Sequence, residues 1–130
     1  LVQLLIRKVM QEEDRQHHEP HRRSLPHVLV LTTLPDRDAA CALARSLVAD
    51  RLAACVSVGA PVESIYHWRG AIETATEVRL TVKTRAELFD AVAAAIRERH
   101  PYELPEILAV PVTDGTAEYL AWIDAETDAR

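Results

Sequence analysis

The fold of this chain is indicated most clearly by residues 53–84, AACVSVGAPVESIYHWRGAIETATEVRLTVKT. Residues 53–58 are small or β-branched and predict a strand, which Gly59-Ala60-Pro61 bends or bulges before it resumes over residues 62–68. Arg69-Gly70 then predicts a turn. After the turn comes the clearest two-residue period in the chain, with Val78, Leu80 and Val82 alternating against Glu77, Arg79, Thr81 and Lys83. The stretch therefore predicts one long antiparallel hairpin.

The predicted hairpin strands are longer than the roughly 5–6 residues of an average strand, so we expect them to project beyond the helices that cover the rest of the sheet. Bare strand edges and aromatic side chains at the tip are costly to leave in water. Contact with other subunits would cover both. The length of the hairpin therefore predicts an oligomer.

On the N-terminal side of the hairpin, residues 28–33 form a short apolar, β-branched run that predicts a central strand. Asp36 follows it and is placed to cap a helix. That helix carries an apolar stripe and runs to about Asp50.

On the C-terminal side of the hairpin, residues 84–87 match a capping box, in which Thr84 and Glu87 satisfy each other's backbone donors. A helix begins there and is expected to continue to about Arg99. Residues 107–112 predict a fourth strand, and a turn at 114–116 leads into a last helix. The order β-α-β-β-α-β-α is the ferredoxin-like α+β plan with an added C-terminal helix.

Residues 1–26 differ in character from the rest and are interpreted as a leader, a linker or a disordered segment, which leaves residues 27–130 as the folded domain. Apolar residues at helical spacing in residues 1–10 predict a short amphipathic helix, and the polar residues 11–23 predict a linker. The first charges follow the apolar residues, which is the reverse of the order in a secretory signal. We therefore expect neither a signal peptide nor a membrane anchor.

The chain of 130 residues has a formal net charge of −5 at pH 7, and no dense stripe of Lys and Arg stands out from that acidic balance. Nucleic acid and anionic membranes are therefore not expected as partners. The two cysteines, Cys41 and Cys55, match no zinc spacing and no CxxC motif, and we predict buried free thiols. Free thiols are typical of a reducing compartment, which predicts a cytoplasmic protein.

Six short motifs follow one another in the second to last quarters of the chain: LAACV at 52–56, SIYHWRG at 64–70, EV at 77–78, KT at 83–84, HPYELPE at 100–106 and YLAW at 119–122. In this order they resemble the CutA family of divalent-cation tolerance proteins, over about residues 28–126. The resemblance implies a ferredoxin-like protomer in a tight homotrimer, similar in architecture to PII signalling proteins. It also implies a link to tolerance of copper and other divalent metals.

The resemblance also implies a copper site, made in some members by a Cys late in the first strand and two adjacent His before Pro-Tyr. The matching positions are Thr32, Arg99 and His100. Thr32 has no thiolate and Arg99 has no lone pair to give, so His100 alone is the candidate metal ligand. Its alternative role is to interact with the free carbonyls at the end of a helix. A second group of imidazoles could bind metal opportunistically or belong to a solvated tail: His17, His18 and His21, with His27 further along.

In the family, polar and aromatic residues gather near clefts between subunits, and the resemblance implies such a cleft here as a ligand site. The candidate residues of this cleft are Tyr66, Trp68, Lys83, His100, Tyr102, Glu103, Glu106 and Trp122, with Tyr119 beside them. Lys83 suits an anionic ligand, and Glu103 or Glu106 suits a cation. The alternative is that the aromatic residues only pack a subunit interface.

No catalytic motif is present, because the three glycines form neither a GxGxxG nor a phosphate-binding loop, and no GxSxG occurs. We therefore predict that the protein is not an enzyme, and an unrecognised hydrolase is the weakest hypothesis. The main hypothesis is a trimer that serves divalent metal (copper) tolerance by binding a metal ion or a small ligand at clefts between subunits. The alternative is a trimeric scaffold for a partner protein, or a PII-like signalling protein that binds a small metabolite.

Overall fold

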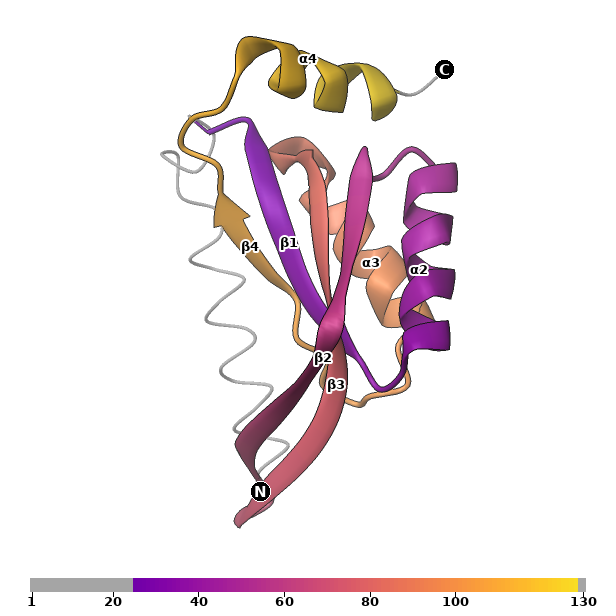
Figure 1. The fold of residues 1–130 in the computed structure, drawn as a ribbon, viewed down its shortest axis with the longest axis vertical. Helices are drawn as coiled ribbons and strands as arrows, with labels where there is room; N and C mark the ends of the chain where they lie inside the picture. Colours follow the sequence, from indigo (N-terminus) through magenta and orange to yellow (C-terminus); the bar gives the residue numbers. More distant parts are fainter. Residues whose placement is uncertain (1–24, 129–130) are drawn as a thin grey trace.

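The computed structural model describes residues 25–128, whose four strands form one antiparallel sheet in the order β2-β3-β1-β4 (Figure 1). Helices α2 and α3 pack on one face of the sheet, and α4 lies across the end opposite the hairpin tip. The predicted ferredoxin-like α+β fold with an extra C-terminal helix is confirmed. The elements are β1 (His27–Leu34), α2 (Arg37–Ala49), β2 (Cys55–Trp68), β3 (Ala71–Arg85), the 3₁₀ helix η2 (Ala86–Leu88), α3 (Phe89–Arg99), β4 (Leu108–Pro111) and α4 (Ala117–Glu126).

The hydrophobic core lies between the sheet and the two helices α2 and α3. Side chains alternate across a strand, and the register of β1 on β3 pairs Val30 with Val82 and Leu34 with Val78, so one apolar face forms. The core side chains are Val28, Val30, Leu34, Leu43, Leu47, Val78, Leu80, Val82, Val92 and Ile96. The opposite face of the sheet, called the open face below, carries Leu31, Thr33, Glu77, Thr81, Lys83, Leu108 and Val110.

The beginnings of the two core helices differ in how well the sequence predicts them. Asp36 caps α2 as expected, because its carboxylate accepts a 2.8 Å hydrogen bond from the backbone N–H of Ala39. The prediction of a capping box at residues 84–87 is wrong. Thr84 instead lies in β3, where its hydroxyl donates to the carbonyl of Leu52 at 2.6 Å, and η2 begins without a side-chain cap. Pairing of β3 with β1 overrides the local helix signal.

The predicted bulge in β2 is confirmed, because the register of β2 on β3 shifts between Val58 and Pro61. Gly59 lies in this bulge, where an added Cβ would come within 3.3 Å of the carbonyl oxygen of Arg79. Backbone therefore approaches backbone closely at this point, which is a reason for glycine in a strand.

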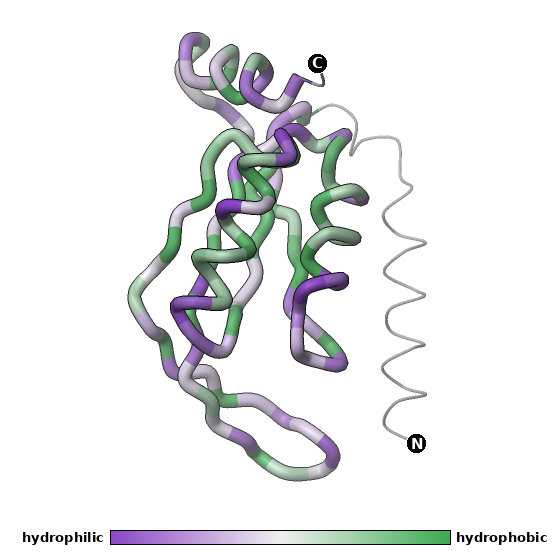
Figure 2. Tube along the Cα trace, turned by 90° about the vertical axis from the view of Figure 1, so that its right-hand side faces the viewer, coloured by the Kyte–Doolittle hydropathy of each residue, from purple (hydrophilic) through white to green (hydrophobic). Residues whose placement is uncertain are grey.

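The hairpin tip is the predicted two-residue turn. Arg69 and Gly70 have φ angles of 51° and 82°, and two successive positive φ angles are what a type I′ turn requires. Figure 2 shows that the hairpin continues beyond the ends of α2 and α3, as its length predicts. Ile65 and Ile72 lie on this projecting part, and 69% and 70% of their surfaces are exposed.

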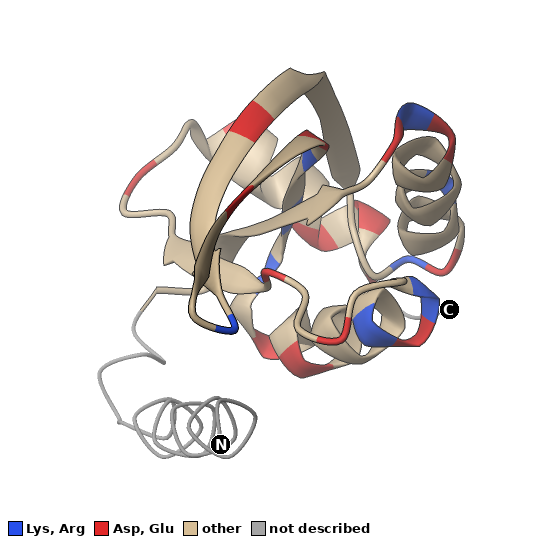
Figure 3. Ribbon diagram, turned by 90° about the horizontal axis from the view of Figure 1, so that it is seen from below, with Lys and Arg blue, Asp and Glu red and all other residues tan. Residues whose placement is uncertain are grey.

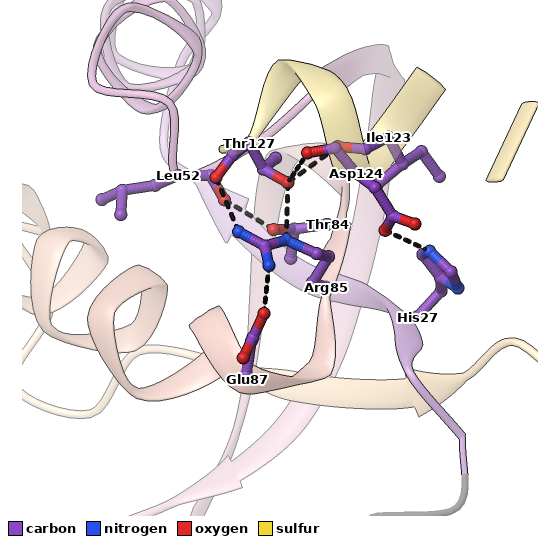
Figure 4. A network of polar contacts seen from close by, with 8 residues as sticks. All are labelled: His27, Leu52, Thr84, Arg85, Glu87, Ile123, Asp124 and Thr127. Atoms are coloured by element: carbon purple, nitrogen blue, oxygen red, sulfur yellow. Dashed lines mark hydrogen bonds and ion pairs between the residues drawn. The ribbon is translucent and has the colours of Figure 1, made fainter. Parts of the chain in front are cut away.

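A polar network joins α4 to the end of the sheet (Figure 4). Arg85 donates to the hydroxyl of Thr127 at 2.9 Å and to its carbonyl at 2.7 Å, and also pairs with Glu87. The carbonyls of a last helical turn lack partners within the helix, so Arg85 satisfies a group that the helix leaves open. His27, which is buried, donates to Asp124 at 2.8 Å.

The helix and linker predicted within residues 1–23 lie outside the described residues, as do His17, His18 and His21. Within residues 25–128, basic and acidic side chains are interspersed along the ribbon (Figure 3). None of the helices in that range is long and apolar enough to cross a bilayer. Cys41 and Cys55 are free thiols as predicted, but both are half-buried rather than buried; for Cys55 the reason is its place on β2, at an edge of the sheet.

Candidate functional site

The predicted site residues come from four parts of the described chain. Tyr66 and Trp68 belong to the last residues of β2, and Lys83 to β3. His100, Tyr102, Glu103 and Glu106 lie in the segment between α3 and β4, and Trp122 lies on α4. Within one protomer, Tyr66 and Trp68 of the hairpin lie near His100, Tyr102 and Glu103 of that segment. Lys83 and Trp122 lie elsewhere.

His100 ends α3, and both of its ring nitrogens are engaged. Nε2 lies 2.6 Å from the carbonyl oxygen of Thr33, so it must carry the proton and donate. Nδ1 accepts from the backbone N–H of Tyr102 at 3.1 Å. The neutral tautomer with the proton on Nε2 satisfies both contacts. Since β4 pairs only with residues 28–31 of β1, His100 takes the place of a strand partner for Thr33.

A buried carboxylate stands beside His100 on the open face. Glu77 is only 7% exposed, and its Oε2 accepts a 3.1 Å hydrogen bond from the hydroxyl of Thr33. The Tyr102 hydroxyl hydrogen bonds to Glu77, and Tyr66 is close enough to interact electrostatically with Tyr102. Tyr102 also packs against the His100 ring, with centroids 4.7 Å apart. These five residues, Thr33, Tyr66, Glu77, His100 and Tyr102, are called the Glu77 cluster below.

This environment shifts the pKa of the Tyr102 phenol. Burial raises its pKa above the usual 10.0, and the negative charge of Glu77, the hydrogen bond to Glu77 and the nearby Tyr66 raise it further. A carboxylate beside a phenol disfavours the phenolate, so Tyr102 remains a hydrogen-bond donor to Glu77 over the physiological pH range.

Sequence reasoning missed Glu77 as a site residue. It belongs to the EV motif, but in the alternation of β3 it occupies the same kind of position as the exposed Arg79. The alternation therefore predicts a solvated side chain. Glu77 is nevertheless buried, and it contacts Tyr102, 25 residues further along, which no local pattern signals.

The hairpin tip is tied to the same segment. The guanidinium of Arg69 donates to the carboxylate of Glu103 at 3.0 Å and lies 5.4 Å from the centroid of the Trp68 ring. This contact brings Trp68 and Glu103, both predicted site residues, to one place. Glu106 lies further along the segment, just before β4, and is half-buried.

Lys83 and Trp122 lie apart from the Glu77 cluster in the protomer. Lys83 is six residues from Glu77 along β3, about 20 Å at the rise of an extended strand. Its ammonium group donates to the hydroxyl of Ser57 at 3.1 Å and lies 3.6 Å from the Cys55 sulfur. Trp122 packs against Tyr119 on α4, with ring centroids 5.4 Å apart.

The three positions that match the family's copper site do not provide a copper ligand set in this protomer. Thr32 points into the core with a fully buried hydroxyl that has no hydrogen-bond partner among the described residues. Arg99 is an exposed cation, and both nitrogens of His100 are already hydrogen bonded. Residues 25–128 contain no group of three or more His, Cys, Asp or Glu side chains placed to hold a metal ion.

Comparisons with known proteins identify the family. The model of the CutA1 divalent ion tolerance protein family matches residues 28–126. Protein CutA, chloroplastic, of Arabidopsis thaliana is 36% identical over 109 residues, which are 84% of this chain and 60% of that protein. The divalent-cation tolerance protein CutA of Thermus thermophilus is 39% identical over 99 residues, 76% of this chain and 96% of that protein.

The fold agrees with solved structures of the family. CutA from Xylella fastidiosa superposes with a TM-score of 0.77 at 43% sequence identity, over 79% of this chain and 99% of that chain. The chain spans only about 60% of the length of the Arabidopsis relative, whose name places that protein in the chloroplast. Since the family model covers most of the sequence and the fold agrees, the chain belongs to the CutA1 divalent ion tolerance protein family.

Proposed function

We propose that this protein is a non-enzymatic homotrimer that serves divalent-metal tolerance by binding a cation at the Glu77 cluster, near a boundary between subunits. The observation that carries the proposal is that Glu77 is buried without an ion-pair partner among residues 25–128. The residue is only 7% exposed, and its hydrogen-bond donors Thr33 and Tyr102 are neutral. The ion pairs formed within residues 25–128 do not include it.

A buried carboxylate has lost hydration, and at Glu77 the groups that replace this hydration are hydrogen bonds from neutral donors. A bound cation would supply the missing charge. The groups around Glu77 that are able to coordinate are oxygens, from a carboxylate and from hydroxyls. Oxygen ligands suit Mn²⁺, Mg²⁺ and Ca²⁺, whereas copper and zinc gain most from nitrogen and sulfur. Copper binding therefore remains a prediction, and the experiment tests Cu²⁺ separately from Mn²⁺.

The test is isothermal titration of Mn²⁺ and Cu²⁺ into the full chain carrying His17→Ala, His18→Ala and His21→Ala, which removes the opportunistic imidazoles. We expect Glu77→Gln to abolish Mn²⁺ binding and the control Glu63→Gln, an exposed carboxylate on β2, to leave it unchanged. Mn²⁺ binding that survives Glu77→Gln would contradict the proposal. Copper binding lost in His100→Ala but kept in Glu77→Gln would instead place the metal at His100.

The proposed trimer is supported by apolar surface that one protomer leaves open. Ile65 and Ile72 protrude with the hairpin, and Leu108 and Val110 are exposed on the open face. Strands β2 and β4 are the two edges of the sheet. Sedimentation should give three times the 14.5 kDa chain mass. Trp68→Ala should weaken assembly by about 2 kcal/mol, because truncated aromatic anchors often cost that much, and the exposed control Val48→Ala on α2 should not.

The second candidate function is a trimeric scaffold or a PII-like protein that binds a small metabolite. The Tyr119–Trp122 pair, exposed on α4, favours docking of a partner, and Lys83 beside Ser57 favours an anionic ligand. A thermal-shift series with nucleotides, in which Lys83→Met removes any stabilisation, would support the metabolite. We also propose a cytoplasmic location, because both thiols are free, and cell fractionation would test it.

A further inference from the structure

The segment between α3 and β4, residues 100–107, is called the strap below, because it ties together parts of the fold that are distant in sequence. It has no regular secondary structure. At its start, His100 donates to the Thr33 carbonyl of β1 at 2.6 Å and also accepts from the Tyr102 backbone at 3.1 Å. These two bonds fix the direction in which the strap leaves α3.

Tyr102 and Glu103, which are adjacent in the strap, hold opposite ends of the projecting hairpin. Tyr102 bonds to Glu77 at the base of the projection, and Glu103 bonds to Arg69 at its tip. Glu77 and the tip are separated by six residues of β3, which is about 20 Å of strand. Adjacent strap residues therefore span the projecting part of the hairpin through the long side chains of Tyr102 and Arg69.

The two ties differ in strength. Tyr102 donates to a buried carboxylate, where a hydrogen bond is poorly replaced by water. The Arg69–Glu103 pair has side chains that are 58% and 51% exposed, and such pairs are weak and easily broken. A movement of Tyr102 away from Glu77 would also move the adjacent Glu103, and the weak Arg69–Glu103 ion pair would then break easily.

We infer that the strap couples the Glu77 cluster to the hairpin tip, so that a cation on Glu77 displaces the Tyr102 hydroxyl, loosens the strap and releases Arg69 from Glu103. This inference rests on the proposed cation site. It adds that occupancy of that site changes the freedom of the hairpin. The position of Arg69 over the Trp68 ring makes Trp68 a reporter of the release, since its environment changes when the guanidinium moves.

The first arm of the test needs no ligand and uses full-length protein carrying Trp122→Phe, which leaves Trp68 as the single tryptophan. Trp68 emission is compared in Tyr102→Phe, Glu103→Gln and the double variant, with Glu63→Gln as the control. If the strap couples the two contacts, each single substitution alters the Trp68 emission in the same direction, and the double variant shows no larger change than a single one. Additive effects, or no effect of Tyr102→Phe, would overturn the coupling.

The second arm adds Mn²⁺ and follows amide hydrogen exchange over residues 66–73 by mass spectrometry. In the parent protein we expect Mn²⁺ to speed up amide exchange at the tip by at most about fivefold, which corresponds to the loss of one weak surface ion pair. In Glu103→Gln, which lacks that pair, we expect Mn²⁺ to leave the exchange rate at the tip unchanged. Mn²⁺ binding without any change at the tip overturns this inference and leaves the proposed function standing. Failure of Mn²⁺ to bind overturns both.

Discussion

Thr32 and Thr84 provide a matched test of how this core treats a buried hydroxyl. Both lie in central strands and both are 0% exposed. Thr84 donates to the Leu52 carbonyl at 2.6 Å, whereas the Thr32 hydroxyl has no partner among the described residues. Replacing either residue by Val makes the same exchange of a hydroxyl for a methyl group, so the two substitutions differ only in the hydrogen bond.

The expected effects have opposite signs. A buried hydroxyl without a partner costs about 1–3 kcal/mol by mutational measures, so Thr32→Val should raise the free energy of unfolding by about 1–2 kcal/mol. Thr84→Val loses a hydrogen bond and leaves the Leu52 carbonyl without that donor, so it should lower the free energy of unfolding by about 1–2 kcal/mol. Both variants exchange Thr for Val, so effects on the unfolded state largely cancel in the difference between them.

Urea unfolding of the two variants and the parent measures this difference. All three must be compared at one protein concentration and with their assembly state checked, since association makes the midpoint depend on concentration. Equal shifts in the same direction would refute the reasoning, because they would show that the hydrogen bond of Thr84 does not distinguish the two sites.

Three further predictions address the helix α4, the hairpin tip and Tyr102. Arg85→Met removes both bonds to Thr127 and should lower the free energy of unfolding by about 1–2 kcal/mol, with faster amide exchange in α4 but not in α2. Gly70→Ala places a side chain at φ 82° and should cost about 1–2 kcal/mol in thermal unfolding, whereas Gly70→Asn should cost less. The pKa of Tyr102, followed by ultraviolet absorbance, should lie above 10.0 and fall in Glu77→Gln. Since the folded protein holds this proton more tightly, the stability it contributes is complete below pH 10 and is lost as pH rises through the folded pKa.

The sequence predicts the order of elements, the bulge and the turn because each depends on neighbouring residues. Val78, Leu80 and Val82 show the alternation of a strand, and Gly70 marks the turn with a backbone conformation that other residues adopt at a cost. The capping box at residues 84–87 failed because its Thr is also a good strand residue, and strand pairing prevailed.

The candidate site depends on contacts between distant residues, and the sequence predicts it only in part. The family motifs pointed to His100, Tyr102 and Glu103, which do lie beside the hairpin. They also grouped Lys83 with these residues, although Lys83 is six residues from Glu77 along β3 and lies apart from them in one protomer. Glu77 was not predicted, since its contacts with Thr33 and Tyr102 join residues that are distant in the sequence.

The bulge at Gly59 divides the hairpin into two parts that are under different constraints. Before it, β2 residues such as Val56 and Val58 pack against the helices, so substitutions there change whether the protomer folds. Beyond it, the strands have no helix beneath them, and substitutions at Ile65 or Ile72 meet only solvent or another molecule. Selection is therefore able to vary the outer half of the hairpin, and with it the association of the protein, while the folding of each protomer stays the same.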